Sequence, residues 1–149
     1  MNDRPRTFTY PFPRPAVTAD VVCLARDGGQ LRVLLIERNH PPFAGCWAIP
    51  GGFVDENESL EDAARRELLE ETTLSGVTIE QFGAYGDPGR DPRGHTVTVA
   101  FIARLDECTP VVGSDDAARA EWFPVDELPP LAFDHDRILA DALRRYLAT

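Results

Sequence analysis

Hydrophobic and polar positions along the chain predict a set of β-strands. Residues 17–26 and 31–38 are apolar and β-branched, and the turn sequence DGGQ at residues 27–30 joins them. A short glycine turn between two such stretches is a strong signal for a β-hairpin. Later stretches with the same strand-like character are residues 77–86, 95–105 and 121–125.

Two further stretches predict helices. Residues 59–72 are expected to form the first helix, with Ser59 as its N-cap and Asp62 in the capping-box position. Residues 134–147 are expected to form the second, because their apolar residues recur at helical spacing. One early and one late helix among strands predict a single domain of the α+β or mixed α/β class.

The first fifteen residues follow neither pattern. They are rich in proline and arginine, and this much proline disfavours a helix or a central strand. We therefore expect an extended arm over residues 1–15 and one folded domain over residues 16–149. The arm lacks the apolar core of a signal peptide.

The composition of the chain limits the binding partners and the cellular environment that we expect. The chain has 149 residues, a formal net charge of −10 and three cysteines without C-x-x-C spacing. Nucleic-acid backbones and anionic membranes select basic surfaces, so we expect neither as a partner. Nothing indicates a disulfide framework or a zinc site, and we expect a reduced, cytoplasmic protein.

The acidic residues are concentrated in one stretch. Residues 55–71 hold eight acidic and two basic side chains, which is six of the ten excess negative charges. On a helix, Glu67, Glu70 and Glu71 share one arc near the C-terminus, where the helix dipole prefers cations. Leu60 and Ala64 lie on the same side as Glu67 and Glu71, so that face points partly toward the protein body. The cluster is either a solvated acidic face, a partner for arginines, or a set of oxygen ligands for Mg²⁺ or Mn²⁺.

The spacing of these residues resembles a known pattern. Over 23 residues, eight of the nine specified positions of the Nudix hydrolase signature are present. They are Gly52, Glu58, Arg66, Glu67, Leu68, Glu70, Glu71 and Leu74. The resemblance implies an α/β/α sandwich with a mixed sheet, and hydrolysis of a nucleoside diphosphate linked to another moiety.

The resemblance also implies a metal site with Mg²⁺, or alternatively Mn²⁺, as the cofactor. Glu67 and Glu71 would be the principal ligands, Glu70 a third, and the carbonyl of Gly51 a backbone ligand. Glu71, Glu70 or a further acid, Asp116, would act in catalysis, because a carboxylate is needed to deprotonate the attacking water. For Asp116 the alternative is a solvated loop acid.

Three other motif residues are implied to be structural. Gly52, Glu58 and Arg66 would hold the loop and the helix in position rather than touch substrate. At the one signature position that does not match, Thr73 replaces the glycine that ends the helix in a left-handed conformation. A β-branched residue disfavours that conformation, so the helix is expected to continue and to end at Gly76.

Two loops indicate the substrate. Residues 87–94 and 131–135 resemble those of ADP-ribose pyrophosphatase-like Nudix proteins and of ADP-ribose-responsive regulators. Arg90 and Arg93 are expected to contact phosphate or the terminal ribose, the alternative being a rigid loop with solvated arginines. Arg38 is a second candidate for phosphate contact, the alternative being a surface charge. Phe43 is a candidate for stacking on the base, the alternative being a position in the core.

The leading hypothesis is therefore hydrolysis of ADP-ribose to AMP and ribose 5-phosphate. Hydrolysis of nucleoside triphosphates or dinucleoside polyphosphates is an alternative, and so is a non-catalytic module that senses ADP-ribose. A homodimer in which the arm crosses to a partner subunit is a further hypothesis.

Overall fold

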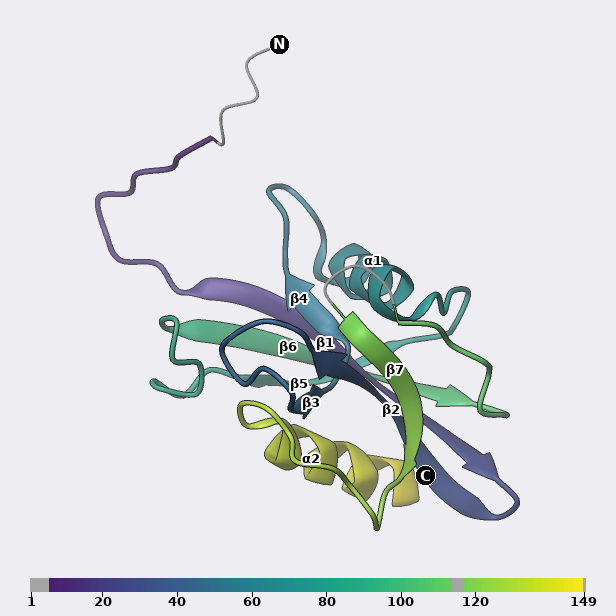
Figure 1. Cartoon of the computed structure of the whole chain (residues 1–149). Helices are drawn as coiled ribbons and strands as arrows, with labels where there is room; N and C mark the ends of the chain where they lie inside the picture. The colour runs from purple at the N-terminus through teal and green to yellow at the C-terminus, as the bar shows by residue number, and fades with distance from the viewer. Residues whose placement is uncertain (1–5, 114–116, 149) are drawn as a thin grey trace.

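A mixed β-sheet lies between two helices (Figure 1). The computed structural model describes residues 6–113 and 117–148. Its elements are β1 (Ala16–Asp27), β2 (Gln30–Arg38), β3 (Trp47–Ala48), β4 (Gly51–Phe53), α1 (Leu60–Thr72), β5 (Glu80–Tyr85), β6 (Thr96–Leu105), β7 (Ala117–Pro124) and α2 (His135–Leu147). The α/β/α sandwich that the sequence predicts is confirmed.

The long strand β1 organises the sheet. The strand order is β3-β2-β1-β6-β5, and β4 and β7 pair with β1 and β2 respectively. β1 runs parallel to β6 and antiparallel to β2 and β4. The predicted β1–β2 hairpin is confirmed, and Gly28 and Gly29 both have positive φ at its turn, as a tight two-residue turn requires.

Two cores form because side chains of a strand point alternately to opposite faces of the sheet. Val22 and Leu24 of β1 pack in the cluster that α2 covers. Val21 and Cys23 pack in the cluster that α1 covers. The two layers of helix are therefore fixed by the alternation within one strand.

Helix α1 begins as the sequence predicts. The hydroxyl of Ser59 accepts a hydrogen bond from the backbone N–H of Asp62 at 3.1 Å. Ala63, Ala64 and Leu68 are buried against the sheet. This packing directs the side of α1 that carries Glu67 and Glu71 toward the end of β4.

The expectation that α1 continues to Gly76 is wrong. The helix ends at Thr72, and Thr73 adopts the left-handed conformation with φ of 65°. The Thr73 N–H donates to the Leu69 carbonyl at 2.9 Å, and the buried Thr72 hydroxyl accepts from the Leu74 N–H at 3.2 Å. The turn places Leu74, only 6% exposed, in the core, and this burial offsets a backbone cost of about 1 kcal/mol.

The other boundaries differ by a few residues. β5 begins three residues later than predicted, β7 begins four residues earlier, and β3 and β4 are short strands that the sequence pattern does not predict. Residues 6–15 belong to no helix or strand and extend away from the sheet (Figure 1). Within the described ranges, no helix is long and apolar enough to cross a membrane.

Candidate active site

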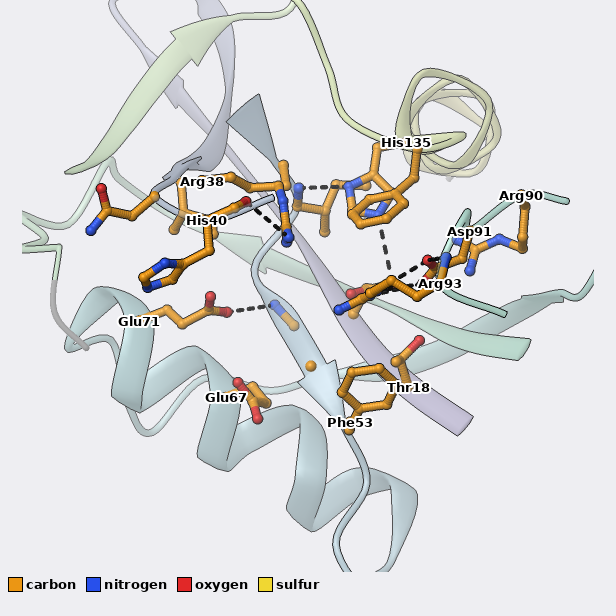
Figure 2. A pocket seen from close by; sticks show the side chains of 18 of the residues that line it. Thr18, Arg38, His40, Phe53, Glu67, Glu71, Arg90, Asp91, Arg93 and His135 are labelled. Carbon is orange, nitrogen blue, oxygen red and sulfur yellow. Dashed lines mark hydrogen bonds and ion pairs between the residues drawn. The ribbon is translucent and has the colours of Figure 1, made fainter. Parts of the chain in front are cut away.

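A cleft of about 370 Å³ opens between α1, the ends of β2 and β4, and two loops (Figure 2). It brings together residues that are far apart in the sequence. From the predicted site, Arg38, Gly51, Gly52, Glu67, Glu71, Arg90 and Arg93 line it. Glu58, Arg66, Glu70 and Phe43 are not in its lining.

Glu67 and Glu71 face the cleft one helical turn apart. Glu71 is 8% exposed, and its Oε1 accepts the backbone N–H of Gly51 at 2.8 Å. Burial raises the pKa of Glu71 to about 8, and burial also raises the pKa of Glu67. A site that raises the pKa of two neighbouring carboxyl groups disfavours their charged forms unless a cation is present.

Two glycines allow the backbone of β4 to approach these carboxylates. A Cβ on Gly52 would lie 2.5 Å from the carboxyl carbon of Glu67. A Cβ on Gly51 would lie 1.9 Å from Oδ1 of Asp20 on the other side. Neither approach is possible with any larger residue, so the glycine pair sets the geometry of the cleft floor.

Arg66 joins the loop after β4 to α1. Its Nε and Nη2 donate to the two carboxylate oxygens of Glu58 at 2.8 and 2.9 Å. Nη2 also donates to the Phe53 carbonyl at 3.0 Å, and Nη1 to Glu67 Oε1 at 2.7 Å. The hydrogen bonds from Arg66 lower the pKa of Glu58 to about 2, so this pair is ionised at neutral pH. Such a contact set is what the predicted structural role of Glu58 and Arg66 requires.

Glu70 does not line the cleft, and it shares Nη1 of Arg66 with Glu67. Its Oε2 lies 3.3 Å from Nη1 of Arg66, and its side chain is 43% exposed. Its predicted role as a third ligand stays a prediction. Asp116, the other predicted catalytic acid, lies outside the described residues.

The back wall of the cleft contains two buried polar residues, Asp20 and His135, which the sequence did not predict as site residues. Asp20 on β1 accepts a hydrogen bond from the Thr98 hydroxyl at 2.5 Å, and burial raises its pKa to about 7. His135 accepts the Ile49 N–H at Nδ1 at 3.0 Å, and burial lowers its pKa to about 3. The neutral ring therefore carries its proton on Nε2, 4.0 Å from Asp20 Oδ2. An aspartate in the middle of an apolar strand is the signal that could have identified Asp20.

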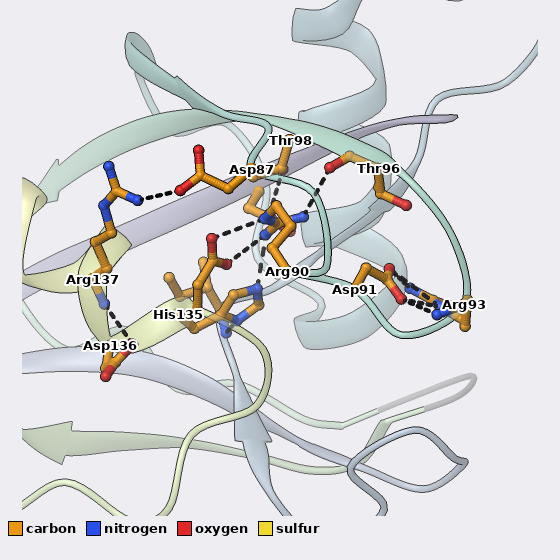
Figure 3. Close-up of polar contacts among 12 residues, drawn as sticks. Asp87, Arg90, Asp91, Arg93, Thr96, Thr98, His135, Asp136 and Arg137 are labelled. Atoms are coloured by element: carbon orange, nitrogen blue, oxygen red, sulfur yellow. Dashed lines mark hydrogen bonds and ion pairs between the residues drawn. The ribbon is translucent and has the colours of Figure 1, made fainter. Parts of the chain in front are cut away.

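The three predicted substrate-binding arginines have different surroundings (Figure 3 shows two of them). Arg90 is buried and donates to both carboxylate oxygens of Asp134, at 2.9 and 2.6 Å. Arg93 donates through Nε and Nη2 to the buried carboxylate of Asp91, at 3.0 and 2.7 Å. Nε of Arg38 donates to the Pro42 carbonyl at 2.8 Å, and its guanidinium lies 5.0 Å from the centre of the Phe133 ring.

Phe43, the predicted stacking residue, packs edge-on against another aromatic ring. The centres of the Phe43 and Phe133 rings are 4.9 Å apart, and Phe133 is the ring of the pair that lines the cleft. Stacking of Phe43 on a base stays a prediction.

The residues present fit a divalent cation. No group of three or more histidine, cysteine or acidic side chains is gathered as a metal site within residues 6–113 and 117–148. Glu67 and Glu71 nevertheless supply hard oxygen donors beside the glycine backbone of β4, and burial makes both costly to ionise alone. A cation held by two carboxylates and completed by water and substrate oxygens is the usual pattern for Mg²⁺.

This fold and this helix-borne carboxylate site are those of a Nudix-type domain. The family model for the NUDIX domain matches residues 14–143, and the chain belongs to this family. Among its relatives, the ADP-ribose pyrophosphatase of Methanocaldococcus jannaschii is 44% identical over 135 residues. That alignment covers 87% of this chain and 74% of the relative.

Two further comparisons involve regulators. The ADPR responsive transcriptional repressor NtrR of Acinetobacter baylyi is 36% identical over 90% of this chain and 55% of the repressor. The chain therefore spans just over half the length of that relative. The structure of the NUDIX domain of Shewanella oneidensis NrtR complexed with ADP ribose is similar, with a TM-score of 0.85. It is 36% identical over 91% of this chain and 90% of that domain.

Proposed function

We propose that this chain is a Nudix pyrophosphohydrolase that hydrolyses ADP-ribose to AMP and ribose 5-phosphate. The observation that carries the proposal is the pair of Glu71, which is buried, and Glu67, which is partly buried, against the glycine backbone of β4 at the floor of a cleft. The 44% identity with an ADP-ribose pyrophosphatase supports the choice of substrate.

Glu67, Glu71 and the carbonyl of Gly51 are the groups that would hold the metal ion, with Glu70 as a further ligand. We propose Mg²⁺, with Mn²⁺ as the alternative. When bound, a divalent cation offsets the charge of the diphosphate and lowers the pKa of a water molecule at the site.

Three residues of the chain have separate roles in the proposed hydrolysis. Glu71 lies at the floor of the cleft, and its carboxylate, in the ionised form that a bound cation would favour, would accept a proton from water. The hydrogen bond from the Gly51 N–H fixes the position of this carboxylate. Arg38 lies on the opposite wall and contributes positive charge where the diphosphate would lie.

Substitution of Glu71 by glutamine tests this function. The change keeps the side-chain volume and removes the base, so kcat for ADP-ribose should fall by at least about 10²-fold. AMP release is measured by chromatography at saturating Mg²⁺. The enzyme hypothesis is wrong if the unmodified protein binds Mg²⁺ but releases nothing from any diphosphate substrate in a panel.

The similarity to an ADP-ribose-bound NrtR domain favours a second candidate, a module that senses ADP-ribose. The two functions differ in one observation, because a sensor binds ADP-ribose without releasing AMP. Nucleoside triphosphates and dinucleoside polyphosphates belong in the same panel, and a higher kcat/KM for either would replace ADP-ribose as the substrate. A homodimer, the absence of nucleic-acid partners and a cytoplasmic location stay predictions.

A further inference from the structure

His135, the first residue of α2, contacts the backbone that connects β3 to β4 (Figure 2). Its ring lines the cleft but is only 4% exposed. Nδ1 of the ring accepts the Ile49 N–H at 3.0 Å, although the two residues are 86 positions apart in the chain. The start of α2 is therefore joined to residues 49–51, which we call the connecting segment.

The connecting segment carries backbone groups of the carboxylate site. The Gly51 N–H donates to Oε1 of Glu71 at 2.8 Å, and the Gly51 carbonyl is a proposed metal ligand. The segment has only two N–H groups, because Pro50 has none. One of them donates to His135 and the other donates to Glu71, so the two contacts are neighbours along the same backbone.

Strand β1 holds the end of this segment that is nearer β4. The Val21 N–H donates to the Pro50 carbonyl at 2.9 Å, and β4 pairs with β1 from Gly51 onward. Ile49 lies before that pairing and is 2% exposed. Without His135 the Ile49 N–H would be buried without an acceptor, which is unfavourable. We therefore expect the segment to shift until this N–H reaches another acceptor.

The imidazole of His135 is in the tautomer that the contact needs. A ring nitrogen that accepts a hydrogen bond carries no proton, so the proton is on Nε2. This nitrogen lies 4.0 Å from Oδ2 of Asp20, which also accepts the Thr98 hydroxyl at 2.5 Å. An oxygen on that side favours the proton on Nε2 and leaves Nδ1 as the acceptor for Ile49.

We propose that His135 is a positioning residue for the carboxylate site. By holding Ile49, it fixes the Gly51 N–H on Glu71 and, with it, the position of the Gly51 carbonyl. Residues that orient metal ligands in this way affect metal affinity without touching the ion. This inference rests on the proposed function, and in it His135 acts through Ile49 rather than through contact with the substrate.

Two amide substitutions separate this role from packing. The side-chain oxygen of asparagine is the same number of bonds from Cα as Nδ1 of histidine, whereas the amide of glutamine reaches the position of Nε2. His135→Asn therefore keeps an acceptor for the Ile49 N–H, and His135→Gln loses it. Glutamine is closer to histidine in volume, so a role in packing alone predicts the opposite order of effects.

Amide hydrogen exchange of the full chain without metal measures the positioning directly. In His135→Gln, exchange at Ile49 and Gly51 should accelerate at least about tenfold, because both N–H groups lose a fixed acceptor. In His135→Asn, exchange at both amides should stay within about threefold of the unmodified protein. Leu143→Ala is the control, since it removes packing of α2 against the same core and should change neither amide.

Metal affinity and steady-state kinetics complete the test. The calorimetric Kd for Mn²⁺ should increase about tenfold in His135→Gln and less than about threefold in His135→Asn. With Mg²⁺, kcat for ADP-ribose should fall in the same order, and KM should change less than about twofold. A higher KM at unchanged kcat would show that His135 touches the substrate, and would overturn the proposal. Equal or greater losses in His135→Asn would reduce His135 to a packing residue and would overturn it as well.

The outcomes distinguish this inference from the proposed function. If the unmodified protein releases no AMP, yet exchange at Gly51 follows the expected order, the function is wrong and the positioning role stands. If the unmodified protein hydrolyses ADP-ribose, but His135→Gln leaves exchange at Gly51 and the Kd for Mn²⁺ unchanged, the positioning role is wrong and the function stands. His135→Gln decides this alone if the smaller asparagine prevents folding.

Discussion

Substitution of Gly52 by alanine perturbs the carboxylate site without touching the charge of any group. The added Cβ would lie 2.5 Å from the carboxyl carbon of Glu67, whereas ordinary contacts begin at 3.4 Å. The carboxylate must therefore move by about 1 Å, and misplacement on that scale costs about 10²-fold in rate. The end of a flexible side chain can move cheaply, so the free energy of unfolding should change by less than about 1 kcal/mol.

The measurement combines kcat for ADP-ribose, calorimetric affinity for Mn²⁺ and the thermal midpoint. Gly83→Ala is the matched control, because its Cβ would meet the Tyr85 ring at an ordinary 3.5 Å. Gly51→Ala is the opposite case, since its Cβ would lie 2.4 Å from the backbone carbonyl of Ala19, and we expect it to disrupt folding. Unchanged kcat and Mn²⁺ affinity in Gly52→Ala would refute the reasoning that Glu67 acts from the position it occupies here.

Three further predictions address the buried groups and the arm. Burial lowers the pKa of His135 to about 3, so as the pH drops this residue is protonated in the unfolded chain before it is protonated in the folded protein. Through His135, the free energy of unfolding therefore falls as the pH drops below about 6.5. His135→Gln should reduce that loss by about 2 kcal/mol at pH 5 in urea titrations, and an unchanged pH slope would contradict it. Asp134→Ala leaves the buried Arg90 without its partner and should lower the free energy of unfolding by about 3 kcal/mol, whereas Asp136→Ala, at an exposed position in the first turn of α2, should not. Deletion of residues 1–14 should reduce the size of the protein in gel filtration if the arm holds a dimer together, and identical elution would refute that role.

The parts of the fold that the sequence predicts are those with local causes. The β1–β2 hairpin depends on its own turn glycines, and the start of α1 depends on Ser59 and the N–H three residues later. β3 and β4 have two and three residues and no periodicity, and they exist because β2 and β1 pair with them. Thr73 shows the same limit, because burial of Leu74 decides where α1 ends and overrides the preference of a β-branched residue.

The site also has one part that the sequence predicts and another part that it does not. The carboxylates of α1 follow from spacing along one helix, which a linear motif records. Asp20 and His135 reach the cleft through hydrogen bonds to Thr98 and Ile49, 78 and 86 residues away in the chain. The surroundings of Arg90 and Arg93 are equally invisible in the sequence, because an arginine near a predicted phosphate site and an arginine paired with a buried aspartate have the same local pattern.

The electrostatics of the cleft connect its stability to its function. Burial raises the pKa of Glu71 to about 8 and that of Asp20 to about 7. Because these values exceed those of the unfolded chain, Glu71 and Asp20 bind more protons in the folded protein between about pH 4 and pH 8, and the contribution of these two groups to stability falls as the pH rises through that range, opposite in sign to that of His135. The last turn of α1 contains no basic residue to offset the charge. A divalent cation would supply the missing positive charge and would compete with protons for the same carboxylate oxygens. The carboxyl groups that destabilise the folded protein at neutral pH are therefore the groups through which a metal ion would stabilise it. Within the acidic stretch of residues 55–71, Glu67 and Glu71 are then a cost of folding that the proposed reaction requires, whereas Asp55, Glu56 and Glu61 are exposed to solvent.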